Sequence, residues 1–278
     1  MRVRQSTLGT WQDCALKARF KHIDLLPGKT GSKQMFGTCV HAALAQYART
    51  GDVQQAVKVF TDDWANATID VWNRTNTFKG LSQRGVEIIK AQHERQQWQA
   101  RKIVAVEHRF LVPFGEHELE GTVDLIELKK NHRGKEILRV VDHKTTSKMP
   151  TASELYLSVQ GTVYVYATLQ PEFWLGNGRE FPGLPNGEWQ FEMLSDVERR
   201  FIWNHLWTDK ELDGGGRTKE DFERVYRQIN EIEKAIEADI FVPTISHASC
   251  EYCDYAEDPC PVRVPTRDEI TNQDSSWL

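Results

Sequence analysis

The stretch GTVDLIELKKNHRGKEILRVVDHK, residues 121–144, decides the fold, because it predicts two β-strands joined by a tight turn. Two apolar runs, the second rich in β-branched residues, flank residues 131–134 (Asn-His-Arg-Gly), which supply turn chemistry. Each run carries one aspartate, Asp124 or Asp142, among apolar neighbours. The sequence therefore predicts a hairpin with one carboxylate on each strand.

The second strand should place an acid and an amine on one surface. Side chains alternate along a strand, so Asp142 and Lys144 point to one side and His143 to the other. If Asp124 shares that side, the two carboxylates converge, and converging carboxylates bind a hard divalent cation. The alternative is a pair of solvated residues at a strand end, and these few residues leave it open.

Composition limits the class of protein. The chain has 278 residues, of which 40% are hydrophobic, so it can bury a core and form one large domain. Its net charge is −5, so nucleic-acid binding would depend on local patches. The sequence contains no run that could span a bilayer, and the first residues, MRVRQSTLGTWQD, lack the apolar core of a signal peptide. We therefore expect a cytoplasmic protein without membrane contact.

Helices are expected before the hairpin. Residues 7–20 have apolar residues at helical spacing, and Ser6 is the expected N-cap. Residues 37–49 are strong helix formers that Gly51 should stop, which would put His41 near the first turn.

A helical insertion and a strand complete this half. Residues 52–100 predict further helices, rich in Gln and Ala. Three tryptophans are the expected core anchors there: Trp64, Trp72 and Trp98. Residues 103–112 predict a strand that brings Glu107 beside the hairpin.

After the hairpin, residues 152–169 predict a helix with Gln160 and Tyr164 four positions apart on one face. A proline- and glycine-rich loop, a strand at residues 189–194 and a helix capped by Ser195 should follow. A last helix should bury one apolar stripe: Phe222, Val225, Tyr226, Ile229, Ile232 and Ile236. This order of elements predicts an α/β fold with a mixed sheet flanked by helices.

Five cysteines without an export signal argue against a disulfide framework. Cys250-x-x-Cys253, followed by Cys260, is typical of a metal-ligand cluster and leaves one coordination place open. Cys39 is expected to be a small buried apolar residue.

Four short motifs follow one another along the chain: Gly37-x-x-x-His41, Gly121-x-x-Asp124, Asp142-x-Lys144 and Gln160-x-x-x-Tyr164. In this order they resemble the RecB-like branch of the PD-(D/E)xK nuclease superfamily, over roughly residues 6–260. The resemblance implies a restriction-endonuclease-like core in a single domain of residues 1–264, and we expect residues 265–278 to be a polar disordered tail.

The resemblance implies a metal-dependent DNA nuclease, an exonuclease that acts on single strands or DNA ends. Four residues would hold Mg²⁺ or Mn²⁺: His41, Asp124, Asp142 and, through its backbone carbonyl, His143. The catalytic residues would be Asp124, Asp142 and Lys144, and Lys144 would orient the attacking water. Gln160 and Tyr164 would contact the substrate or fix Lys144 in place. Alternatively, His41 is an ordinary core or surface histidine and Gln160 and Tyr164 only pack on the sheet. Glu107 would support the site or lie on the surface.

An iron-sulfur subgroup of this family includes CRISPR-associated adaptation exonucleases and AddB nuclease domains. By resemblance to it, a [4Fe-4S] cluster would join the two ends of the chain through four thiolates: Cys14, Cys250, Cys253 and Cys260. Zn²⁺ is the chemical alternative. The implied partners are DNA and a helicase, a recombinase or a CRISPR-adaptation protein. A rival hypothesis is a non-catalytic module that grips DNA or protein in such a complex. Cleavage polarity, strand preference, pathway and oligomeric state stay open.

Overall fold

The computed structural model describes residues 1–72, 76–95, 102–131, 133–175, 194, 197–246, 250, 253–256 and 258–262. The chain divides into two compact units. The first, here called the sheet unit, comprises residues 1–5 and 30–228. The second, the terminal unit, comprises residues 6–29 and 229–278, so it joins segments from both ends of the chain. Each unit is described separately below.

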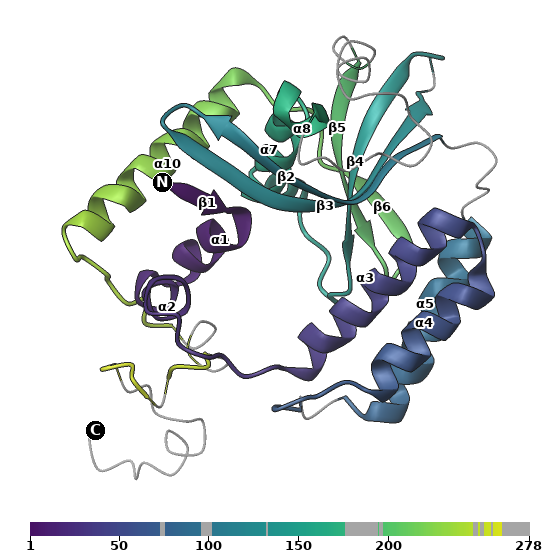
Figure 1. Ribbon diagram of the computed structural model, residues 1–278, viewed down its shortest axis with the longest axis horizontal. Helices are drawn as coiled ribbons and strands as arrows, with labels where there is room; N and C mark the ends of the chain where they lie inside the picture. Colours follow the sequence, from purple (N-terminus) through teal and green to yellow (C-terminus); the bar gives the residue numbers. More distant parts are fainter. Residues whose placement is uncertain are drawn as a thin grey trace, which may run out of the picture. The chain divides into compact units, whose positions relative to one another are not determined.

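The sheet unit is built on a mixed β-sheet (Figure 1). Its strands are β1 (Arg2–Arg4), β2 (Lys102–Phe114), β3 (His117–Lys130), β4 (Glu136–Lys144), β5 (Glu198–His205) and β6 (Lys210–Asp213). The strand order is β1-β3-β4-β5-β6, and β2 pairs with β3 along most of its length. The β1–β3 and β4–β5 pairs are parallel and the others antiparallel. The expected α/β fold with a central mixed sheet is confirmed.

The predicted hairpin is β3 and β4, and its turn has the expected chemistry. The Asn131 side-chain oxygen accepts hydrogen bonds from the backbone N–H groups of Arg133 (2.9 Å) and Lys135 (3.0 Å). Gly134 has φ +76°, a left-handed conformation that glycine adopts without steric cost. The turn therefore sets the register of the two strands that carry Asp124 and Asp142.

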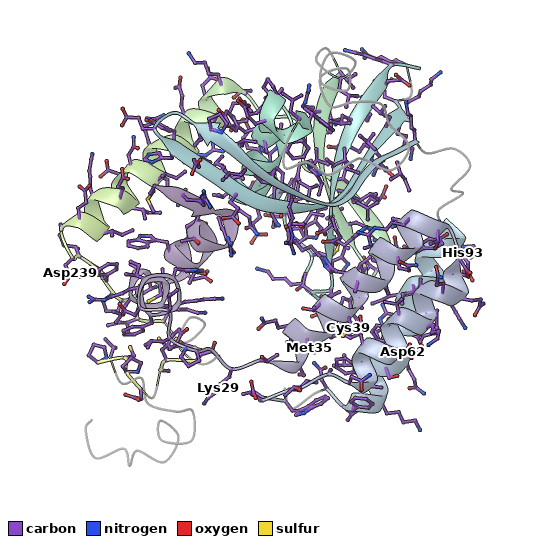
Figure 2. All side chains as sticks on the ribbon, in the orientation of Figure 1. Lys29, Met35, Cys39, Asp62, His93 and Asp239 are labelled. Carbon is purple, nitrogen blue, oxygen red and sulfur yellow. The ribbon has the colours of Figure 1, made fainter. Side chains whose placement is uncertain are left out.

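Three helices pack together beside the sheet: α3 (Ser32–Thr50), α4 (Val53–Ala65) and α5 (Phe78–Arg95). Their apolar faces form one core that includes Phe36, Phe60 and Trp64. Figure 2 labels Cys39 on α3 and Asp62 on α4; Cys39 is 3% exposed, as expected for a buried apolar residue. This core fixes α3, which also contacts β2 and β3.

The other helices of the sheet unit follow the hairpin: α6 (Ala152–Tyr156), α7 (Val159–Ala167), α8 (Pro171–Leu175) and the first half of α10 (Lys219–Glu237). Helix α7 contacts β3 and β5. A Cβ atom at Gly161 would lie 2.6 Å from a ring carbon of Phe201 on β5. Glycine thus allows α7 to approach the sheet closely, which brings Gln160 to β4.

The terminal unit contains α1 (Gln5–Asp13), α2 (Ala15–Ala18), the π-helix η1 (Arg19–Ile23) and the end of α10. Two aromatic contacts join its segments: Trp11 with Phe241 (centroids 5.5 Å apart) and Phe20 with Tyr255 (5.5 Å). Within the described parts of both units, no helix combines the length and apolarity needed to cross a membrane.

Four expectations for the first half of the chain are wrong. The predicted helix 7–20 is interrupted at Cys14, whose backbone is extended (φ −167°, ψ 119°), and Ser6 lies inside α1 instead of capping it. Because α3 begins at Ser32, His41 lies in the middle of the helix rather than in its first turn. Trp72 is 40% exposed and is not a core anchor. Trp64 is buried as predicted, and Trp98 lies outside the described residues.

The second half also differs from the sequence prediction. The expected helix 152–169 is two helices, because Ser158 accepts a hydrogen bond from the Gly161 N–H (3.1 Å) and starts α7 anew. The helix expected after Ser195 is the strand β5. Its buried run is short, and periodicity does not distinguish such a run from a helix. The strand predicted at 189–194 and the cap at Ser195 lie outside the described residues except for Leu194. The tail from residue 265 also lies outside them.

Candidate active site

The two aspartates of the hairpin lie where β3 and β4 separate. Leu125 and Val141 form the last backbone pair, and the same register brings Asp124 opposite Asp142 one step further. There the Asp124 carboxylate replaces a backbone partner, because its Oδ2 accepts a hydrogen bond from the His143 N–H at 2.7 Å. The carboxylate is thereby fixed at the end of the strand.

Asp142, Lys144 and Gln160 form a closed contact between β4 and α7. Lys144 Nζ lies 2.7 Å from Asp142 Oδ2 and donates to Gln160 Oε1 at 2.8 Å. The Gln160 amide donates in turn to Asp142 Oδ1 at 2.9 Å. The predicted shared side of Asp142 and Lys144 is confirmed. Gln160 Nε2 also lies 3.1 Å from the hydroxyl of the buried Tyr164, so the predicted shared helix face is confirmed as well.

A second group forms around Asp124. It contains His41 of α3, Glu107 of β2 and Asp124 of β3. Each offers one possible metal-ligand atom, and the three atoms lie within 4.8 Å of one another. His41 Nδ1 lies 3.4 Å from Asp124 Oδ2. Glu107 has φ +51°, a conformation that is uncommon outside glycine, asparagine and aspartate. Such strain is typical of functional sites, where the surrounding structure holds it.

The acids and the histidine shift one another's protonation. Burial alone would lower the pKa of His41, but the nearby carboxylates, Asp124 above all, raise it to about 9. Burial opposes ionisation of Asp124, yet His41 and the His143 N–H lower its pKa to about 2. Burial raises the pKa of Asp142 to about 6 despite Lys144. Burial and the Asp124 charge raise the pKa of Glu107 to about 7.

The side chain of His143 points to the opposite face of the sheet, as predicted. Its Nδ1 lies 2.9 Å from the Asn204 amide nitrogen on β5, which also donates to Gln92 Oε1 at 3.1 Å. Burial lowers the pKa of His143 to about 4, so this imidazole is neutral at pH 7. Because the amide donates to Nδ1, the ring proton lies on Nε2.

Sequence reasoning missed two neighbours of the motif residues. They are Asn204 and Trp203, whose ring centroid lies 5.1 Å from Lys144 Nζ. Both belong to β5, which the sequence pattern indicated to be a helix, so no signal placed them at the site. Glu107 had a usable signal, because its strand was predicted to border the hairpin.

The described side chains are chemically suited to a divalent cation. Carboxylate oxygens and an imidazole nitrogen from His41, Glu107 and Asp124 converge, and this set suits Mn²⁺ or Mg²⁺. Asp142 Oδ2 is buried and makes no hydrogen bond of regular geometry with any described residue, although the Lys144 ammonium lies beside it. A buried oxygen in this state fits a metal ligand or a water partner.

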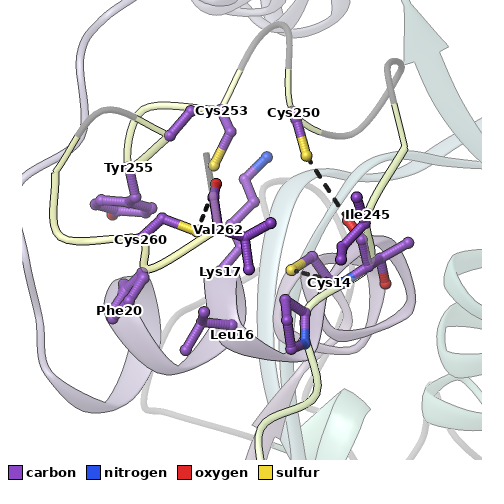
Figure 3. Close-up of a pocket in the computed structure, with 13 residues that line it drawn as sticks. Cys14, Leu16, Lys17, Phe20, Ile245, Cys250, Cys253, Tyr255, Cys260 and Val262 are labelled. Atoms are coloured by element: carbon purple, nitrogen blue, oxygen red, sulfur yellow. Dashed lines mark hydrogen bonds between the residues drawn. The ribbon is translucent and has the colours of Figure 1, made fainter. Parts of the chain in front are cut away.

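Four cysteines line one pocket of the terminal unit, and all of them are free thiols: Cys14, Cys250, Cys253 and Cys260 (Figure 3). Apolar side chains, including Phe20 and Tyr255, complete the wall. The Thr244 N–H donates to the Cys14 sulfur at 3.4 Å. The break between α1 and α2 occurs at Cys14, so the residue that the cluster hypothesis singled out interrupts the predicted helix.

The chain was compared with known proteins. A family model described as the PD-(D/E)XK nuclease superfamily matches residues 2–258. No curated protein matches the chain. Among solved structures, the one titled "Crystal structure of SSO0001" is similar over 93% of this chain and 96% of that chain, with 10% sequence identity and a TM-score of 0.34.

Proposed function

Because the chain belongs to the PD-(D/E)XK nuclease superfamily, we propose that it is a metal-dependent DNA nuclease, an exonuclease that hydrolyses phosphodiester bonds in single strands or at DNA ends. The observation that carries this proposal is the closed contact of Asp142, Lys144 and Gln160, next to the group of His41 and Asp124. A carboxylate paired with a lysine ammonium, next to a set of possible metal ligands, suits hydrolysis of a phosphodiester.

His41, Asp124 and Asp142 would hold Mg²⁺ or Mn²⁺ together with the backbone carbonyl of His143. Glu107 joins this set in our proposal, since its carboxylate lies with His41 and Asp124. The cation, when bound, polarises phosphate oxygens and acidifies water. The place of Asp142 opposite Asp124 at the end of the β3–β4 pairing supports the assignment, and its Oδ2 is paired in this structure with the Lys144 ammonium.

Lys144 acts on the attacking water in this proposal. Its ammonium lies between Asp142 Oδ2 and Gln160 Oε1 at 2.7 and 2.8 Å, so it is held at the carboxylate rather than free to rotate into solvent. From there it can donate a hydrogen bond to a water and favour loss of that water's proton. Gln160 positions both partners, and Tyr164 supports Gln160 from within α7.

For the terminal unit we propose a [4Fe-4S] cluster held by the four cysteines that share its pocket. Thiolates are the soft ligands that such clusters require, and a backbone N–H aimed at a cysteine sulfur, as from Thr244 to Cys14, is among the contacts that tune them. The default role of the cluster is structural, because it would tie residues near both ends of the chain. Zinc bound in place of iron and sulfide in the purified protein would contradict this assignment.

The proposed function is tested by incubating anaerobically purified protein with end-labelled DNA in Mg²⁺ or Mn²⁺. Single- and double-stranded substrates, linear and circular, report strand preference and the need for ends. We expect cutting of linear DNA and none in EDTA. Asp142→Ala and Lys144→Ala should fold and not cut. Wild-type cutting by either variant would overturn the site assignment. No cutting by wild-type protein under any of these conditions would favour a non-catalytic binding module.

A further inference from the structure

A groove of about 670 Å³ runs along one side of α3 in the sheet unit and opens at the candidate metal centre. His41 and Glu107 both line it. Most of its wall comes from a single helix, with Thr145 from the chain after β4 opposite. The groove therefore continues away from the site where cleavage is proposed.

The wall of α3 has a regular order of side chains. Lys33, Gly37, His41, Ala45 and Arg49 recur at every fourth position of α3, and all five line the groove. At a rise of 1.5 Å per residue, Lys33 and Arg49 are each about 12 Å from His41 along the axis. The groove thus has a cation at each end and the candidate metal ligand midway.

Small side chains keep the middle of the groove open. Gly37, Ala42 and Ala45 contribute no long side chain to the wall. The groove is narrow at Gly37, because a Cβ atom there would lie 3.1 Å from Thr145 Oγ1. A polymer backbone could approach α3 closely at Ala42 and Ala45, which lie between the two cations.

The two cations are exposed and available to a ligand. In the part of the chain that the structure describes, neither Lys33 nor Arg49 makes an ion pair within 4 Å, whereas the exposed Lys58 on α4 pairs with Asp62 at 2.5 Å; the charge of Arg49 acts at longer range on Glu107 in the same groove. Lys33 lies in the first turn of α3, where a positive side chain opposes the helix dipole. Its position therefore does not stabilise the helix, but it adds to the attraction of that end for an anion.

We propose that this groove binds a DNA strand along α3, with Lys33 and Arg49 contacting phosphates on opposite sides of the scissile bond. The inference rests on the proposed nuclease function and specifies where its substrate lies. The repeating charge of a phosphodiester backbone matches two cations about 24 Å apart along the helix axis. The acidic residue of the groove, Glu107, would hold the metal ion of the proposed function together with His41 and Asp124.

The test measures binding and cleavage separately. Binding of a fluorescein-labelled single-stranded oligonucleotide is followed by anisotropy in Ca²⁺ at several salt concentrations, and cleavage is followed in Mn²⁺. Lys33→Gln and Arg49→Gln should each weaken binding roughly 10-fold at low salt and reduce the slope of log affinity against log salt by about 0.7. In cleavage, KM should rise while kcat changes little.

Matched controls are available on other surfaces. Lys90→Gln on α5 and Arg133→Gln in the β3–β4 turn remove the same charges from exposed positions outside the groove, and both should bind like wild type. Thr38 is exposed in the groove one turn from His41, so Thr38→Glu should weaken binding and Thr38→Lys should strengthen it. Circular dichroism checks that each variant is folded.

The outcomes separate the two proposals. Unchanged binding and KM in Lys33→Gln, Arg49→Gln and Thr38→Glu would overturn the groove assignment even if the protein cuts DNA. Equal competition by polyaspartate would show a surface for any anionic polymer and would also overturn it. If wild-type protein binds DNA through these residues but cuts none, the groove assignment holds and the nuclease proposal fails.

Discussion

The Gln160 amide donates to Asp142 Oδ1 across 2.9 Å, and this bond determines which way the amide faces. With Nε2 directed at the carboxylate, Oε1 is left to accept from Lys144 at 2.8 Å. One neutral side chain thus holds a carboxylate and an ammonium group in a single arrangement. Gln160, on α7 four positions before Tyr164, therefore sets the relative positions of Asp142 and Lys144 on β4.

Removal of this bridge should reduce cutting without unfolding the protein. In Gln160→Ala, Lys144 loses one of its two polar partners and Asp142 loses a donor, so we expect kcat to fall roughly 10- to 100-fold. The exposed Gln54→Ala on α4 is the control and should keep wild-type activity. Single-turnover cleavage measures the effect, and an unchanged rate in Gln160→Ala would contradict a positioning role.

Asp142→Asn should make the metal-free protein more stable while it abolishes cutting. Burial raises the pKa of Asp142 from its ordinary value of 3.8 to about 6, so the fold prefers the protonated acid. Protonated Asp142 stabilises the folded state below pH 4, and this stabilisation is lost as the pH rises through 6. At pH 7.5 the ionised carboxylate destabilises the fold. We expect the variant to have a higher free energy of unfolding than wild type in EDTA at this pH. Mn²⁺ should then raise the Tm of wild type much more than that of Asp142→Asn; equal shifts would argue against Asp142 as a ligand.

Metal binding should release a proton from His41. The pKa of this imidazole is about 9 without metal, because of Asp124 and its neighbours, so the ring is protonated at neutral pH. A histidine ligand must be neutral, and the cation therefore displaces the proton. The affinity for Mn²⁺ should rise up to about 10-fold per pH unit between pH 7 and 9 and then level off. Titration calorimetry in buffers of different ionisation enthalpy measures the proton release, which should decrease in His41→Asn.

Two substitutions at Glu107 should separate its charge from its backbone. Glu107→Gln keeps the left-handed φ of +51° and removes the carboxylate, so Mn²⁺ affinity should fall. Glu107→Gly removes the carboxylate and the backbone strain together. Its free energy of unfolding should be about 1 kcal/mol higher than that of Glu107→Gln. Chemical denaturation compares the two. If Glu107→Gln binds Mn²⁺ like wild type, the carboxylate is not a ligand.

The four cysteines of the pocket should be required for iron. Anaerobically purified protein should be brown and contain iron and sulfide, and Cys253→Ser should lose both. Cys39→Ala is the control, because Cys39 is buried in the core of α3–α5 and its burial raises the pKa of the thiol to about 11. A colourless wild-type protein with one equivalent of zinc would contradict the cluster.

The sequence predicted the hairpin well, because its turn residues and its alternation of side chains are local properties. They were sufficient to place Asp142 and Lys144 on one side of β4 and Gln160 and Tyr164 on one side of α7. The contact between these two pairs depends on a close approach of helix to sheet at Gly161, which a single sequence does not reveal.

Other parts of the site could not be predicted from local pattern. Glu107 reaches the site through a reversed φ in the middle of a strand, and a strand prediction assumes the opposite sign. Asn204 depends on β5, where the sequence pattern indicated a helix. Cys14 lies between two helices, where the apolar spacing predicted a single continuous helix.

The division of the chain has a consequence for biosynthesis. The terminal unit needs residues 6–29 and residues 229–278, and residues 30–228 of the sheet unit are translated between them. At 5–20 residues per second, the ribosome takes roughly 10–40 s to make the intervening 200 residues. During that time the segment around Cys14 has none of its pocket partners. The proposed cluster, held by all four cysteines, would therefore have to be inserted after the last of them is translated, and a chain that ends before residue 229 would lack three of the four.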